Sequence, residues 1–139
     1  MLVFAHTPPP HHGQSFMVQL LLDVFGSESH RAAHSSRPPE ADEIECHHVN
    51  CRLSQGIGDI GQMRPGKLFR LVGYCLQAIA RRFRHRIPNF YYIPAPGMRS
   101  ALYRDWLVML LCRPFFQRLI LHWQAGGLAE WLEQTARPW

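Results

Sequence analysis

The stretch LVFAHTPPPHHGQSFMVQLLLDVF, residues 2–25, contains the two patterns on which the fold depends. Leu2 to His6 is a short apolar run that ends at three prolines, which is typical of a strand that enters a loop. From Gln14 to Phe25 the apolar residues recur at helical spacing, and Gly26 is placed to end a helix. This part of the chain therefore predicts one strand–loop–helix unit.

The same alternation continues along the rest of the chain. Further strands are expected over Ile44–Leu53, Phe90–Ile93 and Arg118–Trp123, and further helices over Lys67–Arg86, Ser100–Cys112 and Leu128–Gln134. Alternating strands and helices predict a parallel sheet with right-handed helical crossovers, which is an α/β, Rossmann-like fold with flanking helices. In such folds, ligands bind beyond the carboxyl ends of the strands.

Length and composition indicate one globular domain. The chain has 139 residues, of which 47% are hydrophobic and 18% charged. Residues 27–42 are polar and contain Pro38-Pro39, so we expect a flexible loop there. No secretory signal is recognisable at the start, and the longest apolar run, Trp106 to Cys112, is too short to span a membrane. The four cysteines show no C-x-x-C spacing and, without a secretory signal, are expected to be reduced, buried thiols, so the protein is expected to be cytoplasmic.

Two phosphate-loop patterns occur in QGIGDIGQMRPGKLF, residues 55–69. Gly56 to Gly61 spells G-x-G-x-x-G, and Gly61 to Lys67 spells G-x-x-x-x-G-K. The context supports neither: Pro65 delays the helix, and no acidic residue follows about twenty positions later to bind a ribose. Leu68 stands where a hydroxyl must hold magnesium. We expect a crevice loop without a nucleotide.

The segment Cys46-His47-His48-x-x-Cys51 offers thiolate and imidazole groups and raises the possibility of zinc. On a strand, however, His48 would share a face with Cys46 while His47 shares one with Cys51. Four ligands would not converge, so a buried strand with incidental histidines is favoured and no metal is expected.

The polar segment His11 to Ser15 occupies the turn between the first strand and the first helix. Backbone N–H groups at a helix start lack partners, and the helix dipole there favours an anion. Gly13 would let a ligand approach the backbone. The expected substrate-binding residues of this turn are His12, Gly13, Gln14 and Ser15. The alternative is a polar turn with a satisfied cap. His122 ends the fourth strand and points toward the same crevice, although a purely structural role is the competing interpretation.

The net charge of +5 favours anionic partners. The long helix ends in a basic group, consisting of Arg81, Arg82, Arg84 and Arg86. Cations at a helix carboxyl end can be simply structural, or they can contact anionic lipid headgroups. No nucleic-acid partner is expected, because no recognition module or aromatic stacking platform accompanies the charge.

Four stretches resemble the amino-terminal half of bacterial family 4 glycosyltransferases: LVFAHTPPPHHGQSFMVQLLL, HVNCRLSQGIGDIGQMRPGKLFRLVGYCLQAI, FYYIPAPGMRSALYRDWLVMLLCRPFF and LILHWQAGGLAEWL. The resemblance implies a GT-B architecture, in which two Rossmann-like domains face each other across a cleft. It implies transfer of a sugar from a nucleotide sugar to an acceptor with retention of configuration, usually without a metal. The amino-terminal domain of such enzymes mainly holds the acceptor.

The resemblance also suggests roles for individual residues. The loop with Gly13 would face the donor phosphates and the acceptor. His122 matches the family's strand-end histidine near the reacting sugar and is the expected catalytic residue. Arg99 and Arg104 are expected acceptor contacts. The chain departs from the family at His12-Gly13, where many members carry paired glycines.

The family's E-x₇-E pair, which contacts the donor in the second domain, is absent, since no two glutamates here lie eight positions apart. Residues 1–139 are therefore expected to form a single, incomplete Rossmann-like domain that is inactive alone. The implied partners are a sugar or lipid-linked acceptor of the cell envelope and a missing carboxyl-terminal domain or separate donor subunit. The nucleotide sugar would be a substrate of the complete enzyme. Such an enzyme would be peripheral at the inner membrane face. The alternative is a stand-alone phosphosugar-binding or interaction module.

Overall fold

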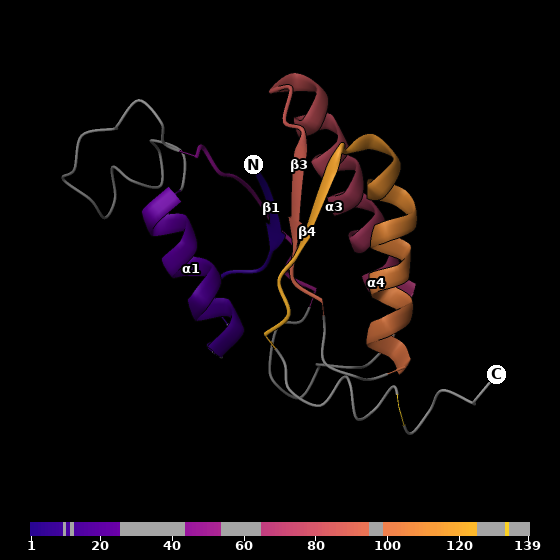
Figure 1. Cartoon of the computed structure of the whole chain (residues 1–139). Coiled ribbons are helices and arrows are strands. Elements are labelled where there is room, and N and C mark those ends of the chain that lie inside the picture. Colours follow the sequence, from indigo (N-terminus) through magenta and orange to yellow (C-terminus); the bar gives the residue numbers. More distant parts are fainter. Residues whose placement is uncertain are drawn as a thin grey trace.

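The computed structural model describes residues 1–9, 11, 13–25, 44–53, 65–94, 99–124 and 133. The elements in chain order are β1 (Leu2–Ala5), α1 (Gly13–Phe25), β2 (His47–Asn50), α3 (Pro65–Arg84), β3 (Asn89–Tyr92), α4 (Arg99–Cys112), the 3-10 helix η2 (Arg113–Phe115) and β4 (Arg118–Leu121). Figure 1 shows these elements as a sheet with helices on both sides. The predicted Rossmann-like α/β class is confirmed.

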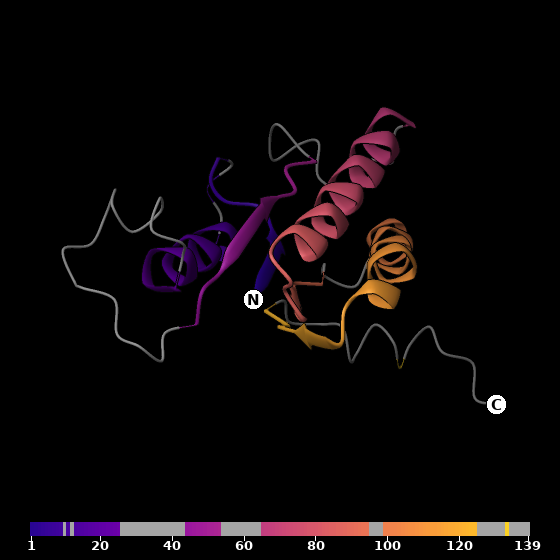
Figure 2. The same ribbon diagram turned by 90° about the horizontal axis from the view of Figure 1, so that it is seen from above.

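The four strands are parallel and lie in the order β2-β1-β3-β4. The chain moves from β1 to β2 in one direction and from β2 past β1 to β3 and β4 in the other. Right-handed crossovers in opposite directions place their helices on opposite faces of a sheet. Accordingly, α1 covers one face, and α3 and α4 lie together on the other (Figures 1 and 2).

Strand β1 is buried throughout because helices cover both of its faces. Its side chains alternate: Leu2 and Phe4 enter the core under α3 and α4, while Val3 and Ala5 enter the core under α1. The α1 core is small and contains Val18 and Leu22 of that helix.

The core under α3 and α4 is larger and rich in aromatic rings. The ring of Phe90 lies 5.6 Å from that of Phe4 and 4.7 Å from that of Phe116, measured between centroids. The helices contribute Leu71, Cys75, Ala78, Val108 and Cys112 to this core. Leu71, Cys75 and Ala78 thus form the packing face of α3, whereas Leu68, Leu76 and Phe83 of the same helix are exposed.

The expected elements are present wherever the structure describes the chain. Helix α3 begins at Pro65, slightly before the expected start, because proline lacks an N–H group and is well suited to a first helical turn. It ends at Arg84, and Arg86 then adopts a positive φ of 52°. The expected second strand is shorter than its apolar pattern suggested. The expected helix Leu128–Gln134, apart from Glu133, and the expected loop at residues 27–42 lie outside the described residues.

Candidate functional site

The strand order creates a switch point at the carboxyl edge of the sheet. After β1 the chain turns toward β2, whereas after β3 it turns toward β4. Loops that diverge in this way leave a crevice between the ends of the two central strands, and this is the usual ligand site of open α/β sheets.

The start of the first loop is fixed by a reciprocal pair of hydrogen bonds. The backbone N–H of Thr7 donates to Asn50 Oδ1 at 3.3 Å, and Asn50 Nδ2 donates to Thr7 Oγ1 at 3.0 Å. The pair ties the chain after β1 to the end of β2. Sequence reasoning missed it, although polar residues at the ends of two strands were an available signal.

A hollow of about 370 Å³ lies at this edge on the α1 side. Its lining comes from Gly13, Gln14 and Met17 in the first turns of α1 and from His122, Trp123 and Gln124 after β4. Three residues expected to form the site, Gly13, Gln14 and His122, are thus brought together from distant parts of the sequence. Gln124 was not foreseen. Its Oε1 is buried and accepts no hydrogen bond from the described residues.

The α1 end of the hollow suits an anionic group. The helix begins at Gly13 and has no acidic residue in its first turn. Backbone N–H groups in a first turn have no acceptor within the helix, and the dipole makes this end positive. No atom lies within 4 Å of the position that a Cβ at Gly13 would occupy. Packing therefore does not require glycine here, and the space is open to a ligand.

His122 is solvent-exposed but held by two contacts with β3. Its backbone N–H donates to the Tyr92 carbonyl oxygen at 3.0 Å. Its Nδ1 is hydrogen-bonded to the Tyr91 hydroxyl, and the two rings meet nearly at right angles with centroids 5.8 Å apart. Burial and, to a smaller extent, Cys46 raise the pKa of Tyr91. The phenol therefore stays protonated and can donate to Nδ1, which leaves Nε2 for a ligand.

The other expected site residues are placed differently. His12 lies outside the described residues, as does the side chain of Arg99, whose backbone begins α4. Ser15 is fully buried on the core side of α1 and does not line the hollow. Among the expected binding residues of the first turn, only Gly13 and Gln14 are seen at the hollow.

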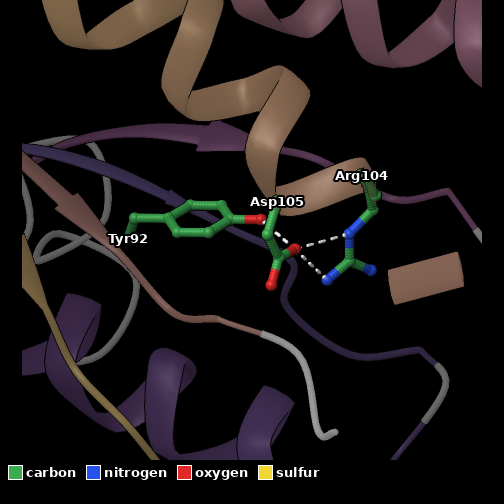
Figure 3. A network of polar contacts seen from close by, with 3 residues as sticks. All are labelled: Tyr92, Arg104 and Asp105. Carbon is green, nitrogen blue, oxygen red and sulfur yellow. Dashed lines mark hydrogen bonds and ion pairs between the residues drawn. The ribbon is translucent and has the colours of Figure 1, made fainter. Parts of the chain in front are cut away.

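Arg104 belongs to a separate polar network on the α4 side of the sheet (Figure 3). The Tyr92 hydroxyl donates to Asp105 Oδ1 at 2.6 Å, and Arg104 Nε and Nη2 donate to the same oxygen at 3.0 and 2.8 Å. Burial, reinforced by Asp105, raises the pKa of Tyr92 well above its ordinary value. Burial also raises the pKa of the nearby Cys51 thiol to about 12. This network joins α4 to the carboxyl end of β3 and does not line the hollow.

The basic end of α3 divides into structural and exposed residues. Arg81 donates to the His48 carbonyl oxygen, and Arg82 Nε donates to the Phe115 carbonyl oxygen at 3.1 Å. These bonds connect α3 to β2 and to the segment after α4. Arg84 and Arg86 are exposed. Two of the four arginines that could meet lipid headgroups therefore also hold the fold together.

The histidines and cysteines near β2 are engaged in separate contacts. His48 Nε2 donates to the Ala5 carbonyl oxygen at 2.8 Å, while the His47 ring lies 4.5 Å from that of His85. Burial lowers the pKa of His47 despite the opposing effect of Glu45, which lies 3.4 Å away. Within the described ranges, no three His, Cys, Asp or Glu side chains are grouped to hold a metal ion.

No helix in the described part of the chain has the length and apolar character needed to cross a membrane. Comparisons with protein families, with curated proteins and with solved structures find no match to this chain. The likeness to glycosyltransferases therefore depends on the quoted stretches of sequence alone.

Proposed function

We propose that this chain is the acceptor-side half of a retaining glycosyltransferase, which transfers a sugar from a nucleotide sugar to a cell-envelope glycan or lipid-linked acceptor. The observation that carries the proposal is the hollow that Gly13 and Gln14 share with His122. In the family that the sequence resembles, the corresponding positions are the loop facing phosphates and acceptor and the histidine near the reacting sugar. Their convergence at the sheet edge supports the proposal.

The hollow has the chemistry and the size that a sugar phosphate requires. Its volume of about 370 Å³ falls within the range of small-molecule sites, about 300–1,000 Å³. The first turn of α1 would receive phosphate oxygens on its N–H groups. The Nε2 group of His122, positioned by Tyr91, would hydrogen-bond a hydroxyl of the reacting sugar and orient it.

The proposed reaction requires a donor-binding half, which is supplied by a further domain or by a separate subunit. Residues 1–139 lack the glutamate pair that would contact the donor. Transfer requires donor, acceptor and protein groups held in one geometry. We therefore expect the isolated chain to bind acceptor without turning over a nucleotide sugar.

The test begins with the coding sequence that follows the Trp139 codon. If it encodes a second α/β half with an E-x₇-E pair, the joined protein is assayed for release of nucleoside diphosphate from a panel of nucleotide sugars, with a membrane-lipid extract as acceptor source. His122→Ala should lower kcat by about 100-fold, the scale of one transition-state hydrogen bond. Gln117→Ala, an exposed change before β4, is the matched control and should keep wild-type kcat.

Two results would contradict the proposal. The first is a joined protein that releases no nucleoside diphosphate from any donor of the panel. The second is a His122→Ala variant with wild-type kcat, which would separate the activity from the hollow.

A stand-alone phosphosugar-binding module that pairs with another subunit is the second candidate. It is favoured by the outward face of α1, where Phe16, Met17, Leu20 and Val24 are exposed and where Met17 also lines the hollow. A module of this kind would bind glucose 1-phosphate on its own, with amide shifts at Gly13, Gln14 and His122 in a nuclear magnetic resonance titration. The absence of such shifts would eliminate this candidate.

A further inference from the structure

The outward side of α3 and α4 is apolar, although it faces solvent. Its large side chains are Phe69, Leu76 and Phe83 of α3 and Tyr103, Trp106 and Leu110 of α4, and each is at least 61% exposed. Positions 69, 76 and 83 are seven apart, and positions 103, 106 and 110 are three and four apart. Each set therefore forms a row along one side of its helix.

The two rows belong to one surface, which we call the α3–α4 face. Both helices bury their opposite sides in the same core, through residues such as Cys75 and Val108. Figures 1 and 2 both show the helices next to each other on one side of the sheet. The face extends to Phe115, whose ring meets that of Phe83 edge-on with centroids 6.1 Å apart. Contiguous exposed apolar surface of this kind marks a contact site.

The chain segments that form and flank this face are strongly basic. Residues 65–94 and 99–124 contain ten basic residues: Lys67, Arg70, Arg81, Arg82, Arg84, Arg86, Arg99, Arg104, Arg113 and Arg118. They contain one acidic residue, Asp105, which is already paired with Arg104 at 2.8 Å. This half of the molecule therefore complements an anionic surface and would repel a second copy of itself.

The exposed arginines border the apolar row. Arg70, Gln77 and Arg84 each follow a residue of the row Phe69, Leu76 and Phe83, so they form a parallel polar row one helical step around α3. Arg113 is exposed at the same end of the face as Arg84, two positions before Phe115, and its Nη1 donates to the Phe116 carbonyl oxygen at 3.1 Å. Arginine side chains in such a border can keep their charged groups among lipid headgroups while their stems cover apolar surface.

We propose that the α3–α4 face docks on an anionic lipid bilayer. Trp106, Tyr103 and Leu110 would enter the boundary between headgroups and acyl chains, where aromatic side chains with a polar edge are favoured. Arg70, Arg84 and Arg113 would contact the anionic headgroups. The proposal is independent of the proposed glycosyl transfer, because it uses the opposite side of the sheet from the hollow.

The first experiment measures sedimentation of the full chain with vesicles of phosphatidylcholine alone or with about one-third phosphatidylglycerol. We expect binding to the anionic vesicles to be at least about tenfold tighter, since several cations contribute, and to weaken as salt is raised. Equal binding to both kinds of vesicle, or no binding to either, would overturn the proposal. Tighter binding to a single-stranded oligonucleotide than to vesicles would also overturn it.

Paired variants assign the binding to this face. Trp106→Ser with Leu110→Gln should weaken binding to anionic vesicles by about tenfold or more, because inserted aromatic and aliphatic area is lost. The matched control, Phe16→Ser with Leu20→Gln, removes the same kinds of exposed side chain from α1 and should change binding by less than about twofold. All four positions are exposed, and circular dichroism checks that both variants fold. Equal effects of the two pairs would refute the assignment.

A depth measurement separates insertion from simple charge attraction. Lipids brominated near the headgroup quench nearby tryptophan emission, and the conservative variant Trp106→Phe should bind as wild type but lose most of this quenching. Unchanged quenching in Trp106→Phe would show that the face does not enter the bilayer.

Discussion

The two sides of the sheet bury similar strand residues but differ in what they present to solvent. Helix α1 has no Lys or Arg, and the carboxylate of its one acidic residue, Asp23, accepts a hydrogen bond from Gln19 at 2.7 Å. Helices α3 and α4 contain seven basic residues and a single acidic one, Asp105. Since packing on the sheet needs only apolar contact, this charge difference is not required by the fold. It agrees with the proposals above, in which the two sides meet different partners.

The polar side chains at the carboxyl edge of the sheet also differ between the α1 side and the α4 side. Adjacent tyrosines of β3 point to opposite sides of the sheet: Tyr91 meets His122 on the α1 side, and Tyr92 meets Asp105 on the α4 side. The first contact positions an exposed imidazole at the hollow. The second joins a helix to the sheet and is mostly buried. One contact thus suits ligand binding, and the other suits stability.

The largest expected effect concerns the two cores. Phe90→Ala should lower the free energy of unfolding by about 3–5 kcal/mol, because it opens a cavity among Phe4, Tyr92 and Phe116. Leu22→Ala should fall near the lower end of about 2–5 kcal/mol, since the single helix α1 can relax toward the sheet. Urea unfolding measures both. Phe69→Ala, at an exposed position, is the control and should stay within about 0.5 kcal/mol. If Leu22→Ala costs more than Phe90→Ala, the ranking of the two cores is wrong.

The next largest loss of stability is expected at the adjacent tyrosines of β3. Tyr92→Phe removes a hydrogen bond to a largely buried carboxylate and should lower the free energy of unfolding by about 1.5–3 kcal/mol. Tyr91→Phe loses a bond to an exposed imidazole and should cost about 0.5–1 kcal/mol. In the proposed glycosyl transfer, assayed on the chain joined to its second α/β half, Tyr91→Phe should lower kcat, because His122 loses the hydroxyl that orients it. A larger loss of stability in Tyr91→Phe than in Tyr92→Phe would reverse the assigned roles.

The remaining comparison concerns the dependence of the free energy of unfolding on alkaline pH. In the unfolded chain the Cys51 thiol loses its proton near its ordinary pKa of 9.0, whereas the folded protein keeps it to about 12. The stabilisation from this group is therefore complete below pH 9 and is lost as the pH rises toward 12. Tyr92, whose pKa is also raised, adds to the loss at the upper end.

Urea unfolding at several pH values measures the slope of the free energy of unfolding against pH. Cys51→Ala should flatten this slope between pH 9 and 12. Cys46→Ala, a buried change on the α1 side, is the comparison and should preserve it. A slope that Cys51→Ala leaves unchanged would show that Cys51 does not govern the alkaline response.

Local patterns in the sequence predicted the class of fold and the positions of most elements, because periodicity and turn chemistry depend on near neighbours. They also led to the prediction of Gly13 and His122 as site residues, both of which line the hollow, since a helix start and a strand end at the carboxyl edge can be recognised one element at a time. They did not predict the hydrogen bond of Tyr91 with His122, because it joins β3 to the end of β4, and they did not predict the pairing of Thr7 with Asn50. Gln124 carried no local signal at all.

The sequence by itself therefore determined the alternation of strands and helices, the helical spacing of apolar residues over Gln14–Phe25 and Lys67–Arg86, and the excess of basic residues after position 65. The tertiary structure decided which of these features meet. The order β2-β1-β3-β4 and its register place His122 beside α1, confine Arg104 to the network with Tyr92, and bring the rows of α3 and α4 into one surface. The physical reason is that periodicity orients a side chain relative to its own element, whereas contact between elements depends on how the strands pair.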